Sequence, residues 1–116
     1  MVFNGISKVL STKDNEQYKT IVAFWDEMSQ LYGMENIRGL GYNWTEDSIE
    51  YVIGLKNGVI DNANCDVELP NDGWSIVIGD TNKLPLIYKK IYEGGPLKYE
   101  IEMFFENDKC EIWYYR

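Results

Sequence analysis

The sequence contains no histidine, and this absence limits its chemistry. Histidine-dependent triads and most zinc sites are excluded, and the side chain that most often acts as a general base near neutral pH is missing. Cysteine is scarce too. Cys65 and Cys110 are too few for a disulfide framework and lack CxxC spacing, so we expect free thiols in a reducing compartment. No metal site, cofactor or catalytic residue is predicted.

Basic residues are also in short supply. Eleven Lys and Arg stand against 19 Asp and Glu, which gives a net charge of −8. A nucleic-acid partner would require a Lys/Arg footprint, so the charge argues against one and is compatible with cationic ligands. No apolar run reaches membrane-spanning length, and the N-terminus does not resemble a signal peptide. We therefore expect no membrane association and a cytoplasmic location.

Aromatic residues are abundant instead, at 15% of the chain, with nine Tyr and four Trp. Tyr and Trp combine a large apolar body with a polar tip, so this excess suits a pocket or an interface as well as a core. A length of 116 residues is enough for one domain, residues 1–116, to bury a core without disulfides or metals.

The first half of the chain predicts a strand, a helix and a hairpin. Apolar residues recur at three- and four-residue steps as far as Gly33, which predicts a helix with its N-cap at Thr12 or Asp14. Tyr42 and Trp44 are expected to share one face of the hairpin. The glycines within its strands permit strong curvature or close approach of a ligand. The expected strands are 2–12, 37–44 and 49–55.

The second half repeats this order after a loop and a short strand. The predicted elements are a loop at 56–64, strands at 65–69 and 74–78 around a turn at 70–73, a helix at 83–93, and a hairpin of 98–105 with 110–115. We infer two βαββ units, with halves of about 2–55 and 65–115. The predicted fold is α+β: the duplicated units form a curved antiparallel sheet with two helices, and a ligand cleft lies at the pseudo-twofold seam between the units.

The C-terminal hairpin holds the candidate site. Side chains alternate between the two faces of a strand, so Glu100 and Glu102 should share one face and Ile101 should lie on the other. Such a face can hold a cation. It can equally be an open sheet face on which both glutamates are solvated.

Several short motifs resemble one known family. They are Trp25, Gly39–Tyr42 with Tyr51–Gly54, Leu69–Pro70 with Gly73–Trp74, Tyr99–Phe104, and Glu111–Trp113. Together they resemble the effector-binding domain family shared by AraC-type and MerR-type multidrug regulators and the gyrase-inhibitor-like proteins. Within that family they are most similar to the free-standing integron-associated effector-binding proteins.

The resemblance implies a buried glutamate that meets cationic drugs. The family pattern, an apolar or aromatic residue, Glu, an aliphatic residue and Tyr, fits here in two registers, with Glu102 preferred over Glu100. The 116 residues carry no helix-turn-helix, so a regulatory role would require a separate regulatory protein as partner. The other candidate partner is a second copy of the chain, in a homodimer. The aromatic residues expected to wall the pocket are Tyr42, Trp44, Tyr51, Trp74, Trp113 and Tyr115.

These observations predict a binding or sensor module for lipophilic or planar organic cations, and not an enzyme. Two alternatives stay open. A small hydrolase would use Glu102 as a general base. A protein-interaction module, as in the inhibitor-type relatives, would present an exposed aromatic patch.

Overall fold

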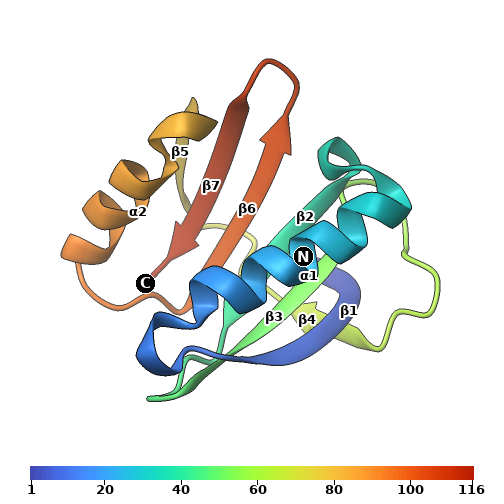
Figure 1. Cartoon of the computed structure of the whole chain (residues 1–116), viewed down its shortest axis with the longest axis horizontal. Coiled ribbons are helices and arrows are strands. Elements are labelled where there is room, and N and C mark those ends of the chain that lie inside the picture. Colours follow the sequence, from blue (N-terminus) through green and yellow to red (C-terminus); the bar gives the residue numbers. More distant parts are fainter.

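Residues 1–116, all of which the computed structural model describes, form seven β-strands and two α-helices. The strands are β1 (Val2–Ser11), β2 (Ile37–Tyr42), β3 (Ser48–Leu55), β4 (Cys65–Glu68), β5 (Ser75–Asp80), β6 (Tyr99–Phe105) and β7 (Lys109–Tyr115). The helices are α1 (Gln17–Tyr32) and α2 (Leu84–Glu93). All strands join one open antiparallel sheet in the order β4-β1-β3-β2-β6-β7-β5 (Figure 1). The α+β prediction is therefore confirmed.

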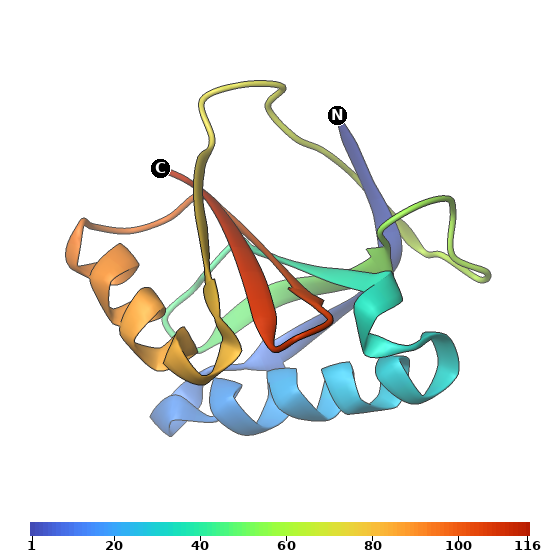
Figure 2. The ribbon, with the colours of Figure 1, turned by 90° about the horizontal axis from the view of Figure 1, so that it is seen from above.

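The sheet is strongly bent, and both helices lie on its outer side (Figure 2). We call this side the helix face and the opposite side the concave face. Each face carries one part of the core. On the helix face the buried residues are Phe24, Trp25, Met28, Ile37, Ile49, Tyr51, Ile53 and Ile60. On the concave face they are Phe3, Leu40, Val52, Leu69 and Ile101.

Two glycines lie against each other where β1 changes its pairing partner. Along β1, the pairing partner changes from β4 to β3 between Gly5 and Ile6. A Cβ at Gly54 would lie 1.9 Å from the carbonyl oxygen of Asn4, and one at Gly5 would lie 2.4 Å from the carbonyl oxygen of Ile53. No side chain fits at either position, so the two backbones cross in direct contact.

Helix α1 begins later than the sequence suggests. The expected N-cap at Thr12 or Asp14 is wrong, because Asp14 and Asn15 have φ values of 52° and 63° and cannot continue into a helix. The helix starts at Gln17 without a side-chain cap, after a 3₁₀ turn over Lys13–Asn15. Its end at Gly33, with φ of 86°, is as predicted.

The first hairpin departs from prediction at one residue. Strand β2 ends at Tyr42, because Asn43 has φ of 50°, a left-handed conformation that interrupts the alternation of side chains. Tyr42 packs on the concave-face core, whereas Trp44 packs on the helix-face core. The expectation that these two side chains share a face is therefore wrong.

The remaining predicted elements are found within a few residues of their expected bounds. Helix α2 follows a 3₁₀ turn over Thr81–Lys83 and has Pro85 in its first turn. The hairpin β6–β7 turns at Asn107 and Asp108, whose φ values are 64° and 57°. Neither α-helix is both long enough and apolar enough to span a membrane.

Candidate functional site

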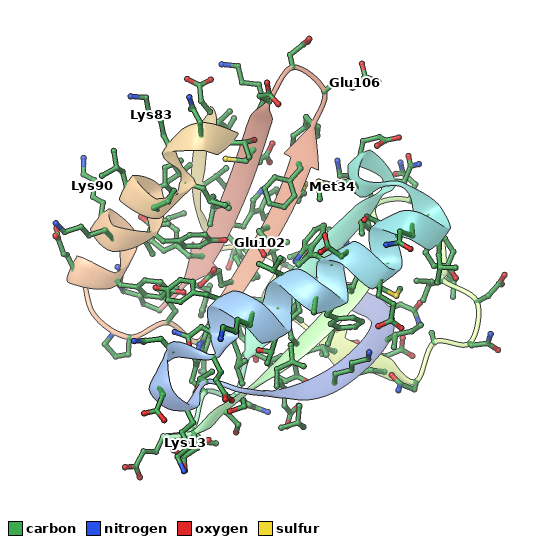
Figure 3. All side chains as sticks on the ribbon, viewed as in Figure 1. Lys13, Met34, Lys83, Lys90, Glu102 and Glu106 are labelled. Carbon is green, nitrogen blue, oxygen red and sulfur yellow. The ribbon has the colours of Figure 1, made fainter.

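Glu100 and Glu102 lie on the helix face of β6, as the alternation predicts. Strand β6 pairs with β2, and the register sets Glu102 opposite Gly39 and Glu100 opposite Gly41. Ile101, between them, is buried in the concave-face core. Figure 3 shows Glu102 in the gap between α1 and α2. Both carboxylates thus lie on a central strand of the sheet, on the face that carries the two helices.

Tyr51 reaches Glu102 from a strand that is not its neighbour. Its hydroxyl donates a 2.5 Å hydrogen bond to Glu102 Oε1 and accepts a 2.8 Å hydrogen bond from Trp25 Nε1. Strand β2 lies between β3 and β6, and the phenol crosses it above Gly39. A Cβ at Gly39 would lie 2.3 Å from Tyr51 Oη. The glycine therefore makes room for this contact.

Helix α2 supplies two more tyrosine hydroxyls. Tyr88 donates to Glu102 Oε2, and Tyr92, one turn later, donates to Glu100 Oε2 at 2.5 Å. The two rings are stacked, with centroids 6.0 Å apart and planes 18° apart. Four residues of helix advance ~6 Å, close to the ~6.6 Å spanned by two residues of strand. One tyrosine therefore faces each glutamate.

No basic side chain neutralises this pair. Glu102 is only 9% exposed, yet its hydrogen-bond donors are the neutral hydroxyls of Tyr51 and Tyr88. The ion pairs of the chain, Lys8–Glu27 and Lys109–Asp80, lie elsewhere. Lys83 and Lys90 extend away from Glu102 (Figure 3). A carboxylate that is buried without a cation is costly, and such sites are over-represented where ligands bind.

The electrostatics follow from this arrangement. Burial, together with the nearby charge of Glu102, raises the pKa of Glu100 to about 7, and the hydrogen bond from Tyr92 opposes only part of that shift. Burial and the charge of Glu102 also hold the pKa values of Tyr51 and Tyr88 well above the usual tyrosine range. Both phenols stay protonated and act as donors. The charge of Glu100 therefore changes near neutral pH.

The sequence-predicted wall residues divide between the two faces. Tyr51 contacts Glu102 directly, and Trp44 lies on the same face beside Gly41, where a Cβ would be 3.5 Å from Trp44 Cζ2. The other four wall residues lie on the concave face, so the sheet separates them from both glutamates. These four are Tyr42, Trp74, Trp113 and Tyr115.

On the concave face these residues form a cluster around Trp74. The Trp74 ring lies 6.1 Å from the Trp113 ring and 5.6 Å from the Tyr115 ring, measured between centroids. Tyr99 joins it, with its centroid 6.2 Å from that of Trp74. Trp113 Nε1 donates a 2.6 Å hydrogen bond to Glu111 on this face, and Trp74 Nε1 donates to the carbonyl oxygen of Pro70. The rings of this cluster therefore pack mainly against one another.

Three residues of the site were not assigned to it from the sequence. The wall residues expected from the sequence do not include Tyr88, Tyr92 or Trp25, which donate hydrogen bonds to Glu102, Glu100 and Tyr51 respectively. Two tyrosines four residues apart on a helix project from the same side. That spacing is the signal that could have identified Tyr88 and Tyr92, once α2 was expected to cover the strand that carries Glu100 and Glu102.

Other features of the surface lie away from this site. One hollow of about 560 Å³ is lined by the loop residues Asp80, Thr81, Asn82, Asn107 and Asp108. Another of about 310 Å³ is lined by Gly73, Ser75, Tyr114, Tyr115 and Arg116. No group of three or more His, Cys, Asp or Glu side chains is placed to hold a metal ion.

Comparison with known proteins identifies no relative. The chain matches no family model, no curated protein and no solved structure.

Proposed function

We propose that this chain is a binding module for organic cations and that Glu102 is its central counter-charge. The observation that carries the proposal is the burial of Glu102 beside Glu100 with no Lys or Arg partner. A bound cation supplies the missing positive charge in a poorly hydrated setting, where charge pairing is stronger than in water. Three phenol rings next to the carboxylates add cation–π attraction of ~0.5–2 kcal/mol each.

Binding requires a change at the carboxylates. Each oxygen of Glu102 already accepts a tyrosine hydrogen bond and the residue is 9% exposed, so an organic cation reaches the carboxylate only if one of the two phenols moves aside. Tyr51 is fully enclosed and is fixed from behind by Trp25, whereas Tyr88 lies on α2 in a half-buried position. The hydroxyl of Tyr88 is therefore the one that gives way, and α2 shifts as it does.

The proposed cleft is the seam between two duplicated units. The order strand, helix, hairpin occurs as β1-α1-β2-β3 and again as β5-α2-β6-β7. The sheet order mirrors this, because β1-β3-β2 on one side meets β6-β7-β5 on the other. Strands β2 and β6 are the pair at the centre, and Glu102 lies in that pair opposite Gly39. Each unit contributes one helix to the walls of the cleft.

The test is calorimetric titration with a panel of lipophilic quaternary ammonium and planar aromatic cations. Glu102→Gln keeps the shape of the side chain, and we expect it to weaken every cation by at least about tenfold, which is about 1.4 kcal/mol. Glu111→Gln is the matched control, since it removes the same charge from the concave face of the same hairpin. Equal losses in the two variants would mean that only overall charge matters, and the proposed site would be wrong.

A hydrolase is the second candidate, and one observation favours it. The pKa of Glu100 is raised to about 7, the range in which a carboxylate serves as a general base at neutral pH. Turnover of an activated ester that is lost in Glu100→Gln and kept in Glu111→Gln would support this function. Absence of turnover across a panel of esters would leave binding as the function.

A further inference from the structure

We propose that the preferred ligand is a dication. Its two positive charges, one for each glutamate, are joined by a short apolar body and are separated by about the length of two strand residues. This rests on the proposed function, because it specifies the ligand of the same site. Glu100 and Glu102 are two residues apart on one face of β6, and each has its own tyrosine on α2. The site thus contains two glutamate–tyrosine pairs side by side, Glu102 with Tyr88 and Glu100 with Tyr92.

The distance between the two glutamate–tyrosine pairs sets the distance between the two positive charges of the ligand. Two residues of a strand span ~6.6 Å, and the Tyr88–Tyr92 step on α2 spans ~6 Å. A ligand that replaces both hydroxyls must therefore carry its positive groups about 6 to 7 Å apart. The stacked rings, 6.0 Å between centroids, form one aromatic wall along the same line and suit a flat apolar body between the charges.

The groups around the site contain no alternative source of the second positive charge. From α1 it is faced by Trp25 and, near Tyr92, by Tyr18; from β3 by Tyr51; from α2 by Tyr88 and Tyr92; and from β7 by Cys110 and by Tyr114, the cross-strand partner of Glu100. All of these are neutral, and burial raises the pKa of the Cys110 thiol. The guanidinium of Arg116 lies over the Tyr114 ring and donates to the carbonyl oxygen of Ile91, and it forms an ion pair with neither glutamate. A monocation on Glu102 therefore leaves an ionised Glu100 uncompensated.

Ionisation of Glu100 gives the proposal a pH signature. With a pKa of about 7, Glu100 is largely neutral one unit below that value and largely charged one unit above it. Below neutral pH the second charge of the ligand finds no charged partner in Glu100. Above neutral pH the second charge of the ligand gains a partner, so the preference for a dication over a monocation increases as pH rises.

A matched pair of ligands tests this. The compound 1,4-bis(aminomethyl)benzene carries two ammonium groups, and 4-ethylbenzylamine replaces one of them with a methyl group of similar size. Calorimetric titration of the intact chain at about pH 8 is expected to show the diamine binding at least about tenfold more tightly. At about pH 6 the preference is expected to fall to about threefold or less.

Variants test whether the second positive charge of the diamine interacts with Glu100. In Glu100→Gln the preference for the diamine over 4-ethylbenzylamine at about pH 8 should fall to within about twofold. Glu111→Gln should retain the full preference. The wild-type pH series provides the same information without a substitution if Glu100→Gln does not fold.

The outcomes separate this inference from the function on which it rests. If both amines bind equally at both pH values, the dication proposal is overturned and the cation site stands. A preference that persists unchanged in Glu100→Gln also overturns it. If neither amine nor any cation of the larger panel binds, the proposed function itself fails.

Discussion

Tyr51 and Glu102 are joined by a 2.5 Å hydrogen bond although their strands, β3 and β6, are not neighbours in the sheet. The phenol passes over β2 at Gly39, the one residue whose side chain would stand in its path. The contact fixes Glu102 from one side, while Tyr88 approaches from α2 on the other. The position of the Glu102 carboxylate therefore depends on the absence of a side chain at Gly39.

Gly39→Ala is expected to disrupt the site. Its Cβ would lie 2.3 Å from Tyr51 Oη and 2.9 Å from Trp25 Cζ2, so the phenol must leave Glu102. Loss of a buried hydrogen bond to a charged group costs about 1–3 kcal/mol, and denaturant unfolding measures it.

Gly41→Ala is the control, because Gly41 lies on the same face of the same strand. A Cβ there would lie 3.0 Å from the end of the Ile49 side chain, which can move, and at ordinary contact distances of 3.5 Å from Trp44 and 3.6 Å from Tyr51. Cation affinity should fall in Gly39→Ala and change little in Gly41→Ala. Equal effects in both variants would mean that β2 tolerates no added volume anywhere, and the specific role of Gly39 would be wrong.

Tyr88→Phe should change stability and affinity in opposite directions. Without its hydroxyl, Glu102 Oε2 loses its donor in a buried position, so unfolding becomes easier by about 1–3 kcal/mol. The same loss removes the group that competes with a cation, so affinity for quaternary ammonium ligands should rise about threefold. Chemical denaturation and calorimetric titration of one preparation measure both quantities.

Tyr92→Phe is the comparison for that experiment. The Tyr92–Glu100 hydrogen bond is exposed, so its loss should cost well under about 1 kcal/mol. If Tyr88→Phe weakened cation binding instead, the hydroxyl of Tyr88 would be a ligand contact and not a competitor.

Stability should depend on pH through Glu100. Its pKa is raised from 4.5 in the unfolded chain to about 7 in the fold, so the folded state holds the proton more tightly. The stabilisation from this group is complete below about pH 4.5 and is lost as pH rises through about 7. Because Glu100 is half-buried and partly screened by water, the effect is on the order of 2 kcal/mol.

The difference between wild type and Glu100→Gln isolates that contribution from the other carboxylates. The free energy of unfolding of wild type should decline relative to the variant between about pH 4.5 and about pH 7. Parallel curves for the two proteins over that range would show that Glu100 titrates as a solvated carboxylate.

Tryptophan fluorescence distinguishes the two faces of the sheet. Trp25 touches Tyr51 on the helix face, whereas Trp74 and Trp113 belong to the cluster on the concave face. A cation bound at Glu102 should alter Trp25 emission, so the ligand-induced change should persist in Trp113→Phe and in Trp74→Phe. A change abolished by either substitution would place the ligand on the concave face. Trp25→Phe also removes part of a buried side chain and should lower the melting temperature.

Local patterns were sufficient to predict the hairpin that carries the acids. In β6 the alternation of side chains is unbroken, so the sequence alone places Glu100 and Glu102 on one face and Ile101 on the other. The positions of the two helices were also predicted, since a broad apolar stripe and a flanking Gly or Pro do not depend on distant contacts.

The sequence did not predict which face of the sheet each aromatic side chain occupies. That depends on the pairing register of neighbouring strands and on breaks in their alternation, which local sequence patterns do not contain. Trp113 follows Ile112 by one residue, so it lies on the opposite face from Glu102, which pairs with Ile112. That pairing is decided by the register of two strands. Trp44 is separated from Tyr42 by the left-handed backbone of Asn43, which a period of two does not anticipate. Tyr88 reaches Glu102 only because α2 folds back over the sheet.

The crossing of β1 and β3 has a bearing on how mutational scans of this protein should be interpreted. A Cβ at Gly54 would lie 1.9 Å from the Asn4 carbonyl oxygen, so every substitution there forces two backbones apart. Gly54 would therefore be among the least tolerant positions of the chain while having no contact with Glu102. A map of intolerance alone would direct a search for the binding site to this crossing. Only a scan scored separately for abundance and for ligand binding would distinguish Gly54 from Gly39.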